Sequence, residues 1–438
     1  MLFRSTHPKM WYATCMGFLD ILKGKSALQS ELFAVLDVSV PAVRMALVKS
    51  GFAEKRIVCD MGSAVYATEH GHESTVLHAG ELTQALRQLA GEHPMLKKAR
   101  RVRIGLGEEL LRSSVYHALF TRQNSADKID QAELQNAFEK AEQASRDDLF
   151  KQMGVGEGRS GGFTLVASYV EEMRVDGYAV PSPVGMQGKE LEIILCNCYA
   201  DSAAEEFIKT AGVLLGVKHP YAISTPYAVS RAYTHAAPAS APIAAIFIQM
   251  SEVLTSVSVV SRNTFLGIKS FSVGNGTFTR GIAMQLGVKY AEALEIRTRY
   301  GDGTVSPAVA RKISGMISRI ADIWVSGISL ALEGFLGELD IFPSRIYLYG
   351  PGTELAELTK ALRESDRFSR IPFLEKRNPM PLVPADFSFF ASFVFPDSSR
   401  RLTHADVGML CLTHEFLREN ASGGALEKLV RRASRLAR

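Results

Sequence analysis

The alternation of apolar and polar positions in the first hundred residues predicts several strands and a helix. Val- and Leu-rich runs at 32–37 and 43–48 are separated by a short turn and have the composition of buried strands. A third strand is expected over 56–67 and a fourth over 102–106. Between them, the apolar residues of 80–91 recur with the spacing of one helix face. This order of elements predicts an α/β fold.

Residues 108–199 have a different pattern. The stretch 127–153 is polar and helix-rich, and Asp130 is placed to cap a helix three residues before Glu133. A glycine-rich loop over 154–162 follows, and 163–199 contains two or three strands. We interpret this block as a small α+β unit that is inserted into a larger domain.

The second half repeats the plan of the first. Helices are predicted over 202–212 and 225–235, and the Ala- and Pro-rich stretch 236–242 has the composition of a linker. Strands over 243–260 and 265–273 precede helices over 279–286, 290–300 and 307–336, a strand over 345–349 and a helix over 354–364. Such an internal duplication is expected of the actin-like, ribonuclease H-type fold.

Length and composition limit the class of protein. The chain has 438 residues, 47% of them hydrophobic, which corresponds to about two to four domain-sized units. It contains no run of about 18 apolar residues, so no transmembrane helix is expected, and residues 1–25 lack the pattern of a secretory signal. The five cysteines are interpreted as reduced, buried thiols of a cytoplasmic protein.

Charge is concentrated at the C-terminus. The net charge is +4, and the last fourteen residues hold five basic residues and one acidic residue. The rest of the chain is therefore neutral on balance, which argues against a broad surface for nucleic acid.

Two segments have a fixed order of residues that periodicity does not explain. The first contains Arg174-Val175-Asp176-Gly177, then Pro183 to Met186, then Gly188 to Glu192, and the second runs from Val273 to Ala283. The first resembles the end of the inserted subdomain of FtsA, the actin-like protein that ties bacterial FtsZ filaments to the membrane. The second resembles the Gly-Gly-x-x-Ile-Thr-x-Asp-Ile-Ala motif of that family. The likeness extends, in order, over residues 32–417.

The resemblance implies an α/β actin-like fold with an FtsA-type, SHS2-like inserted subdomain. Its expected parts are an N-terminal tail at 1–31, a first half at 32–107 that 200–237 completes, the insert at 108–199, a second half at 238–417, and a linker with a basic helix at 418–438.

Proteins of this fold hold ATP and Mg²⁺ between two β-hairpins, whose small residues let backbone N–H groups approach the phosphates. The first hairpin of this chain keeps Asp37 as the residue that would act on Mg²⁺, but Ser39 replaces a glycine and Pro41 removes an N–H donor. The second hairpin lacks both glycine and Asp, and its Glu252 would repel a triphosphate.

The resemblance assigns nine positions to nucleotide binding: Asp37, Ser39, Ser251, Thr255, Gly274, Gly276, Arg297, Gly350 and Gly352. No catalytic residue is identified. Because the phosphate motifs are degenerate, we expect weak or absent ATPase activity and leave open whether ATP and Mg²⁺ bind.

Both ends of the chain have patterns of membrane contact. The tail places apolar residues on one helix face and basic residues around it, as in the C-terminal helix of FtsA. The expected membrane-binding residues are Leu426, Leu429, Val430, Arg431, Arg432, Arg435 and Leu436. Residues 16–25 combine an apolar patch with lysines, and Met16 is a candidate start codon beside Met1. A solvated basic helix and a disordered leader are the alternative interpretations.

The resemblance implies an adaptor of bacterial cell division, located on the inner face of the cytoplasmic membrane. Its partners would be FtsZ or another divisome protein, further copies of itself and the membrane surface, but not nucleic acid. A PilM-like scaffold in pilus or secretion assembly and a divergent active ATPase are the alternative hypotheses.

Overall fold

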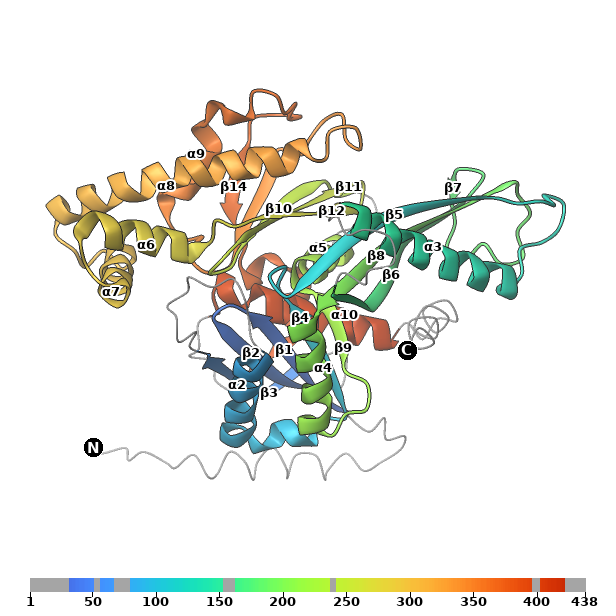
Figure 1. The fold of residues 1–438 in the computed structure, drawn as a ribbon, viewed down its shortest axis with the longest axis horizontal. Coiled ribbons are helices and arrows are strands. Elements are labelled where there is room, and N and C mark those ends of the chain that lie inside the picture. Colours follow the sequence, from blue (N-terminus) through green and yellow to red (C-terminus); the bar gives the residue numbers. More distant parts are fainter. Residues whose placement is uncertain are drawn as a thin grey trace, which may run out of the picture.

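The computed structural model describes residues 31–50, 56–66, 79–152, 162–236, 242–395 and 402–421. Its elements form three sheets with helices around them (Figure 1). The two expected membrane-binding ends, with all seven tail residues from Leu426 to Leu436, lie outside the described residues.

The first sheet has the strand order β15-β3-β2-β1-β4-β9. Its strands are β1 (Leu32–Ser39), β2 (Ala42–Ser50), β3 (Arg56–Val65), β4 (Arg101–Leu106), β9 (Tyr221–Ser224) and β15 (Phe393–Val394). The helices α2 (Ala79–Glu92), η2 (Pro94–Lys98), α4 (Ser202–Leu215) and α5 (Thr225–Ala236) belong to the same half.

The second sheet has the order β12-β11-β10-β13-β14. Its strands are β10 (Ala245–Met250), β11 (Thr255–Ser261), β12 (Thr264–Phe271), β13 (Arg345–Tyr349) and β14 (Asn378–Pro381). Its helices are α6 (Asn275–Leu286), α7 (Tyr290–Gly301), α8 (Pro307–Glu333), α9 (Ala356–Glu364) and η3 (Asp366–Phe368).

The two main sheets have the same plan, which confirms the predicted duplication. In each, three antiparallel strands are followed by two strands parallel to the first: β4 and β9 follow β1, and β13 and β14 follow β10. Parallel strands need a crossover connection, so the loops at their carboxyl ends gather at one edge of each sheet.

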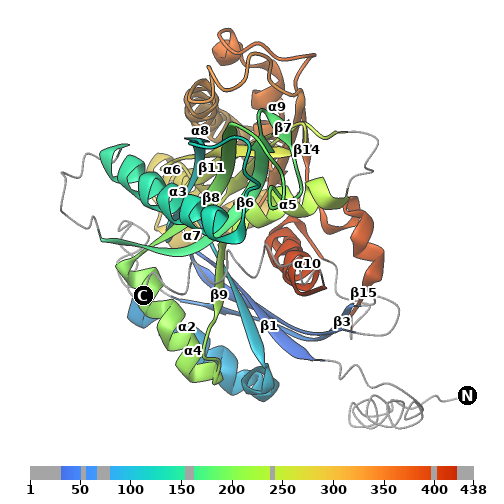
Figure 2. The same ribbon diagram turned by 90° about the vertical axis from the view of Figure 1, so that its right-hand side faces the viewer.

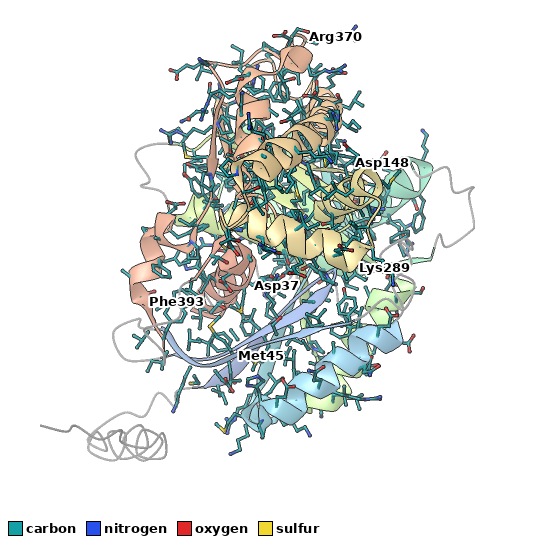
Figure 3. The ribbon with its side chains drawn as sticks, turned by 90° about the vertical axis from the view of Figure 1, so that its left-hand side faces the viewer. Asp37, Met45, Asp148, Lys289, Arg370 and Phe393 are labelled. Atoms are coloured by element: carbon teal, nitrogen blue, oxygen red, sulfur yellow. The ribbon has the colours of Figure 1, made fainter. Side chains whose placement is uncertain are left out.

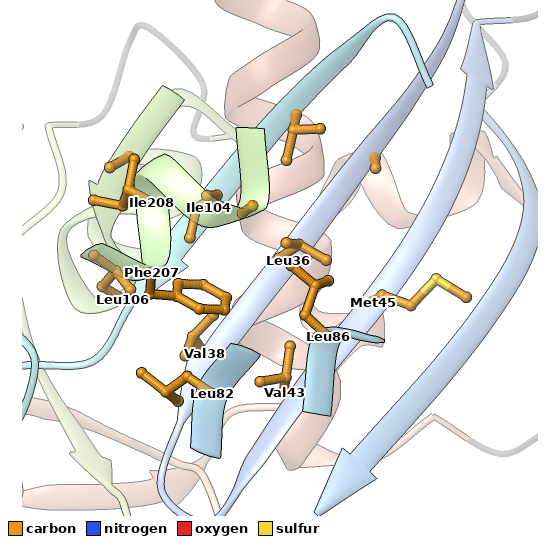
Figure 4. Close-up of a cluster of buried hydrophobic side chains, with 14 of the residues drawn as sticks. Leu36, Val38, Val43, Met45, Leu82, Leu86, Ile104, Leu106, Phe207 and Ile208 are labelled. Carbon is orange, nitrogen blue, oxygen red and sulfur yellow. The ribbon is translucent and has the colours of Figure 1, made fainter. Parts of the chain in front are cut away.

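Apolar side chains of the first sheet pack against α2 and α4, as the helical and strand spacings predict. Figure 4 shows Leu36 and Val38 of β1 and Val43 of β2 facing Leu82 and Leu86 of α2, and these residues are 0% exposed. Phe207 of α4 completes this cluster. The core therefore fixes the position of the turn between β1 and β2.

Helix α8 is the core helix of the second half. It is long and apolar enough to cross a membrane by composition, but 56% of its most apolar window is buried inside the protein. Trp324 is fully buried in it and donates to Thr255 Oγ1 at 2.9 Å. Packing against the second sheet thus accounts for its apolar face.

The insert is an antiparallel sheet of order β5-β8-β6-β7, with α3 (Gln131–Gln152) packed on it. Its strands are β5 (Leu111–Thr121), β6 (Phe163–Val175), β7 (Tyr178–Ala179) and β8 (Glu190–Asp201), of which β5 escaped the sequence prediction. The FtsA-like segment forms its tightest turn, where Asp176 and Gly177 have positive φ. Asp176 Oδ1 accepts from the N–H groups of Lys189 and Glu190, each at 2.8 Å.

The C-terminal part of the predicted second half returns to the first half. β15 pairs with β3, and α10 (Val407–Ala421) packs between α5 and the first sheet (Figure 2). This differs from the expected boundary, which kept residues 238–417 together. The apolar positions Val407, Leu410 and Leu412 cause the return, because they bury against α5 and the first sheet.

Other details also differ from the expectations. Helix α6 begins at Asn275, four residues before the predicted start, and the expected helix start at residue 354 moves to Ala356. Among the described cysteines, Cys196, Cys198 and Cys411 are buried and free, as predicted, whereas Cys59 is exposed. Cys59 lies on β3, which pairs with β2 on one side. On its other side β3 pairs with the two-residue strand β15, so it lies near the edge of the sheet.

Candidate functional site

The expected nucleotide site lies where the two hairpin turns meet, and the two turns touch. The β1–β2 turn holds Val40 and Pro41, and the β10–β11 turn runs from Ser251 to Leu254. The backbone N–H of Glu252 donates to the carbonyl oxygen of Val40 at 3.4 Å. Val253 packs against the core cluster of the first half. The two hairpin turns are therefore in direct contact.

The backbone N–H of the first turn donates its hydrogen bond to a carboxyl group. Glu109 Oε1 accepts from the backbone N–H of Val40 at 2.9 Å, across 69 residues of chain. Burial raises the pKa of Glu109 to about 7, and the hydrogen bond from Val40 opposes this rise. The N–H of Val40 is therefore already bonded within the protein.

A second carboxylate occupies the entrance to α6. Glu252 is buried, its Oε2 accepts from Asn275 Nδ2 at 2.7 Å, and its Oε1 accepts from the hydroxyl of Tyr290. Burial, together with the Glu252 carboxylate, raises the pKa of Tyr290 and keeps this hydroxyl protonated as a donor. The carboxylate of Glu252, which we expected to repel a triphosphate, is therefore also bonded to side chains of α6 and α7.

The backbone donors of α6 are also used internally. The N–H of Asn275 bonds the carbonyl of Ser251 at 2.8 Å, and the N–H of Gly276 bonds that of Glu252 at 2.9 Å. A Cβ on Gly274 would lie 2.6 Å from the backbone of Glu252, and one on Gly276 would lie 2.7 Å from its carboxylate. These glycines allow close approach, but to the protein's own hairpin instead of a phosphate.

Asp37 is buried and held by groups of the protein itself. Figure 3 labels it at the junction of the first sheet, α10 and the second half. Its Oδ1 accepts from Thr225 Oγ1 at 3.0 Å, its Oδ2 lies 4.0 Å from Arg44 Nη1, and Gly408 of α10 packs against it. Burial raises its pKa, and Arg44 offsets part of the rise. This environment does not fit a Mg²⁺ ligand, which needs an ionised carboxylate open to the ion and its waters.

Three other expected positions serve the fold. Ser39 is buried at the end of β1. Ser251 Oγ accepts from the N–H groups of Val253 and Leu254, so it closes its own turn. Thr255 Oγ1 donates to the carbonyl of Val273 at 2.6 Å and accepts from Trp324. Each hydroxyl of the second hairpin is therefore directed into the protein.

Gly350, Gly352 and Arg297, which the resemblance assigns to nucleotide binding, also contact other groups of the protein. Gly350 and Gly352 have positive φ, and a Cβ on either would overlap Met250 or Asn275. Arg297 of α7 donates from Nη1 to the carbonyl oxygen of Asn275 at 2.8 Å. The turn after β13, α6 and α7 thus contact one another directly.

Sequence reasoning missed Glu109, Asn275 and Tyr290. A signal for Glu109 was present: the tandem Glu108-Glu109 comes one residue after the buried strand β4, at the edge where the turns gather. Glu108 is used structurally, since its Oε1 accepts from Ser113 and Ser224 at 2.7 and 2.9 Å. Among the described residues, no cluster of His, Cys, Asp and Glu could hold a metal ion.

Of three comparisons with known proteins, the search of solved structures supports the fold. A scan against models of protein families finds no match, and a search of curated proteins finds none. The PilM-PilN type IV pilus biogenesis complex matches at a TM-score of 0.61 and 15% identity, over 87% of this chain and 98% of that chain.

Two further solved structures match less closely. The ethanolamine utilization protein EutJ from Carboxydothermus hydrogenoformans has a TM-score of 0.41 and 10% identity, over 92% of this chain and 97% of its own. A ROK family glucokinase from Streptomyces griseus, in complex with glucose and AMPPNP, has a TM-score of 0.40 and 10% identity, over 88% and 98%.

The chain has the α/β actin-like ATPase fold. Its two hairpin turns are bonded to each other, Glu109 is bonded to the first turn, and the carboxylate of Glu252, in the second turn, is bonded to Asn275 of α6.

Proposed function

We propose that this protein is a nucleotide-independent assembly platform with an actin-like fold, which recruits a partner protein at the inner face of a bacterial membrane. The observation that carries the proposal is the closure of the phosphate region by Glu109 and Glu252. An enzyme of this fold needs free N–H donors and an ionised Asp beside Mg²⁺, and this chain uses these groups internally. Its function therefore lies in its surfaces.

Two partners are distinguished by different observations. The order of residues from Arg174 to Glu192 resembles FtsA and favours FtsZ or another divisome protein as partner. The fold likeness to the PilM-PilN type IV pilus biogenesis complex favours a pilus or secretion component as partner. We place the FtsZ adaptor first, since it rests on a residue order, and the PilM-like scaffold second.

Calorimetry of the full chain with ATP and Mg²⁺ tests the platform. We expect no heat of binding, because no phosphate donor among Val40, Asn275 and Gly276 is free. We also expect no phosphate release above that of the Asp37→Ala variant. Micromolar binding with release above this control would instead support the divergent ATPase.

Recruitment assays separate the two partners. The full chain is mixed with purified FtsZ, or with the cytoplasmic peptide of a pilus membrane protein, and sedimentation of the complex is measured. FtsZ recruitment supports the division adaptor and peptide recruitment supports the pilus scaffold. If the chain binds neither FtsZ nor the peptide, both partner hypotheses are wrong.

A further inference from the structure

The amino-terminal edge of the first sheet lies opposite the turns described above. Strands β1, β4 and β9 run parallel, so Leu32, Arg101 and Tyr221 begin at one edge and Ser39, Leu106 and Ser224 end at the other. Around the first edge lie η2 and the C-terminal end of α4, side by side at the bottom of Figure 1 and again in Figure 2. Leu96 of η2 and Leu215 of α4 share one core cluster.

This edge is basic. Lys97, Lys98 and Arg100 follow one another closely, and Lys218 and His219 lie in the connection from α4 to β9. All five side chains are exposed, and within the described part of the chain none forms an ion pair with a carboxylate. Because the chain outside its last fourteen residues is neutral on balance, such a group marks a local positive field.

Apolar side chains project from the same edge. Met95, on η2, is 41% exposed, and Val213, in the last turn of α4, is 83% exposed. Apolar side chains that protrude between lysines fit the boundary between lipid headgroups and acyl chains, where the apolar part gains by burial and the cation by attraction. A nucleic acid backbone would use the lysines but not the apolar side chains.

The chain enters the fold at this edge. Glu31 pairs with Arg101 at 3.3 Å, and the N–H of Arg100 donates to the carbonyl of Leu32 at 2.9 Å. The thirty residues before Glu31 include the apolar and lysine-containing stretch 16–25. Glu31, the first described residue, therefore lies at the basic edge and not at the edge that holds the hairpin turns.

We propose that η2, the C-terminal end of α4 and the α4–β9 connection form a membrane-facing surface that binds anionic lipid headgroups. This edge, and not the C-terminal segment alone, orients the folded body, so that the hairpin turns and the insert face away from the membrane. The inference rests on the membrane location in the proposed function. Its readout is separate from nucleotide binding and partner recruitment, so either can fail without the other.

Vesicle sedimentation of the full chain tests the surface. Phosphatidylcholine vesicles with about one-third phosphatidylglycerol are compared with vesicles of phosphatidylcholine alone. Each basic residue near such a surface strengthens binding about five-fold, so Lys97→Glu/Lys98→Glu/Lys218→Glu should weaken binding about 100-fold or more. Raising the salt concentration should weaken wild-type binding in the same direction.

The matched control is Lys360→Glu/Arg363→Glu/Arg370→Glu. These residues are exposed on and after α9, and Figure 3 shows Arg370 at the top of the molecule, far from α2 at the bottom. The control changes net charge equally and should bind like wild type. Equal binding by both triple variants would overturn the proposal, as would binding to duplex DNA but not to vesicles.

A second measurement does not depend on charge. Met95→Trp should place an indole at the headgroup boundary, and brominated lipid should quench its fluorescence beyond the quenching of wild type. Ile323→Trp is the control, because Ile323 is 63% exposed on α8, away from this edge. Quenching of the control variant but not of the Met95→Trp variant would contradict the assigned surface.

Discussion

At the scale of the residue, Glu109 is the most unusual group of the site. The residue is half-buried, one of its oxygens bonds the N–H of Val40, and the other oxygen is buried without a hydrogen-bond partner within the described protein. A carboxyl in this position is stabilised by a proton, since burial penalises its charged form. Its raised pKa, about 7 against an ordinary 4.5, is consistent with that requirement.

The pKa of Glu109 predicts a pH dependence of stability. The folded protein binds the proton of Glu109 more tightly than the unfolded chain does, because the pKa is about 7 in the fold and 4.5 ordinarily. The protonated carboxyl therefore contributes fully to stability below pH 4.5, and the contribution is lost as pH rises through about 7. Glu109→Gln keeps the neutral shape, so it should be as stable as wild type at pH 5 and more stable at pH 8. Urea unfolding at both pH values measures this.

A substitution of the same kind on the surface provides the comparison. Glu364→Gln, at the exposed end of α9, should follow wild type at both pH values. If Glu109→Gln is less stable than wild type at pH 8 as well as at pH 5, Glu109 is ionised in the fold and the assignment is wrong.

At the scale of the element, α10 joins the C-terminal part of the chain to the first half. Its Glu415 is fully buried, lies 2.9 Å from His235 Nδ1 and lies 3.3 Å from Arg231 Nε. Burial alone would raise the pKa of Glu415, but His235 and Arg231 hold it at about 2. Arg231 also donates to the hydroxyl of Tyr227, which donates to Glu171 of the insert.

Glu415→Gln tests this connection. Removing one partner of a buried ion pair leaves the other charge without compensation, so we expect a loss of about 3–5 kcal/mol at pH 7. The pKa of Glu415 is lowered in the fold, so its contribution is present above 4.5 and is lost as pH falls towards 2. The variant should therefore lose less stability on acidification than wild type, as followed by urea unfolding at pH 7 and pH 3.

The exposed Glu338→Gln variant is the control for this experiment, because Glu338 lies outside the buried network. A Glu415→Gln variant as stable as wild type at pH 7 would show that α10 is held by its apolar face alone.

At the scale of the whole molecule, the two halves meet through protein groups where other proteins of this fold admit a nucleotide. The contact of Glu252 with Val40 joins the two hairpins directly. The structure thus supports a body whose closure is built in and does not depend on a ligand. A platform that presents a constant surface to its partners has use for such rigidity.

Hydrogen exchange of the full chain tests this closure. ATP with Mg²⁺ should leave the exchange of the Val40 and Gly276 amides unchanged, since both are already bonded internally. The double variant Glu109→Ala/Glu252→Ala should make these amides exchange about ten-fold faster, because each loses its acceptor or the packing that holds it. Protection of the wild-type amides by ATP would show that the turns open to nucleotide.

The sequence by itself determined the elements and their duplication. Apolar runs at 32–37 and 43–48 could bury only as strands, and the spacing of Leu82, Leu86 and Leu89 could face a sheet only as a helix, because these periods are local properties of the backbone. It also indicated which parts would gather around the site: the second hairpin, Gly274, Arg297 and Gly350 do meet.

Only the tertiary structure decided which side chains lie in that site, and that α10 packs on the first half of the fold. The bond between Glu109 and Val40 spans 69 residues, and Asp37 turns to Thr225 across 188, so no local pattern encodes either partner. The return of α10 to the first half likewise follows from apolar burial against α5, which depends on three-dimensional packing. Periodicity specifies a face of an element, whereas the group that meets that face is fixed when distant elements pack together.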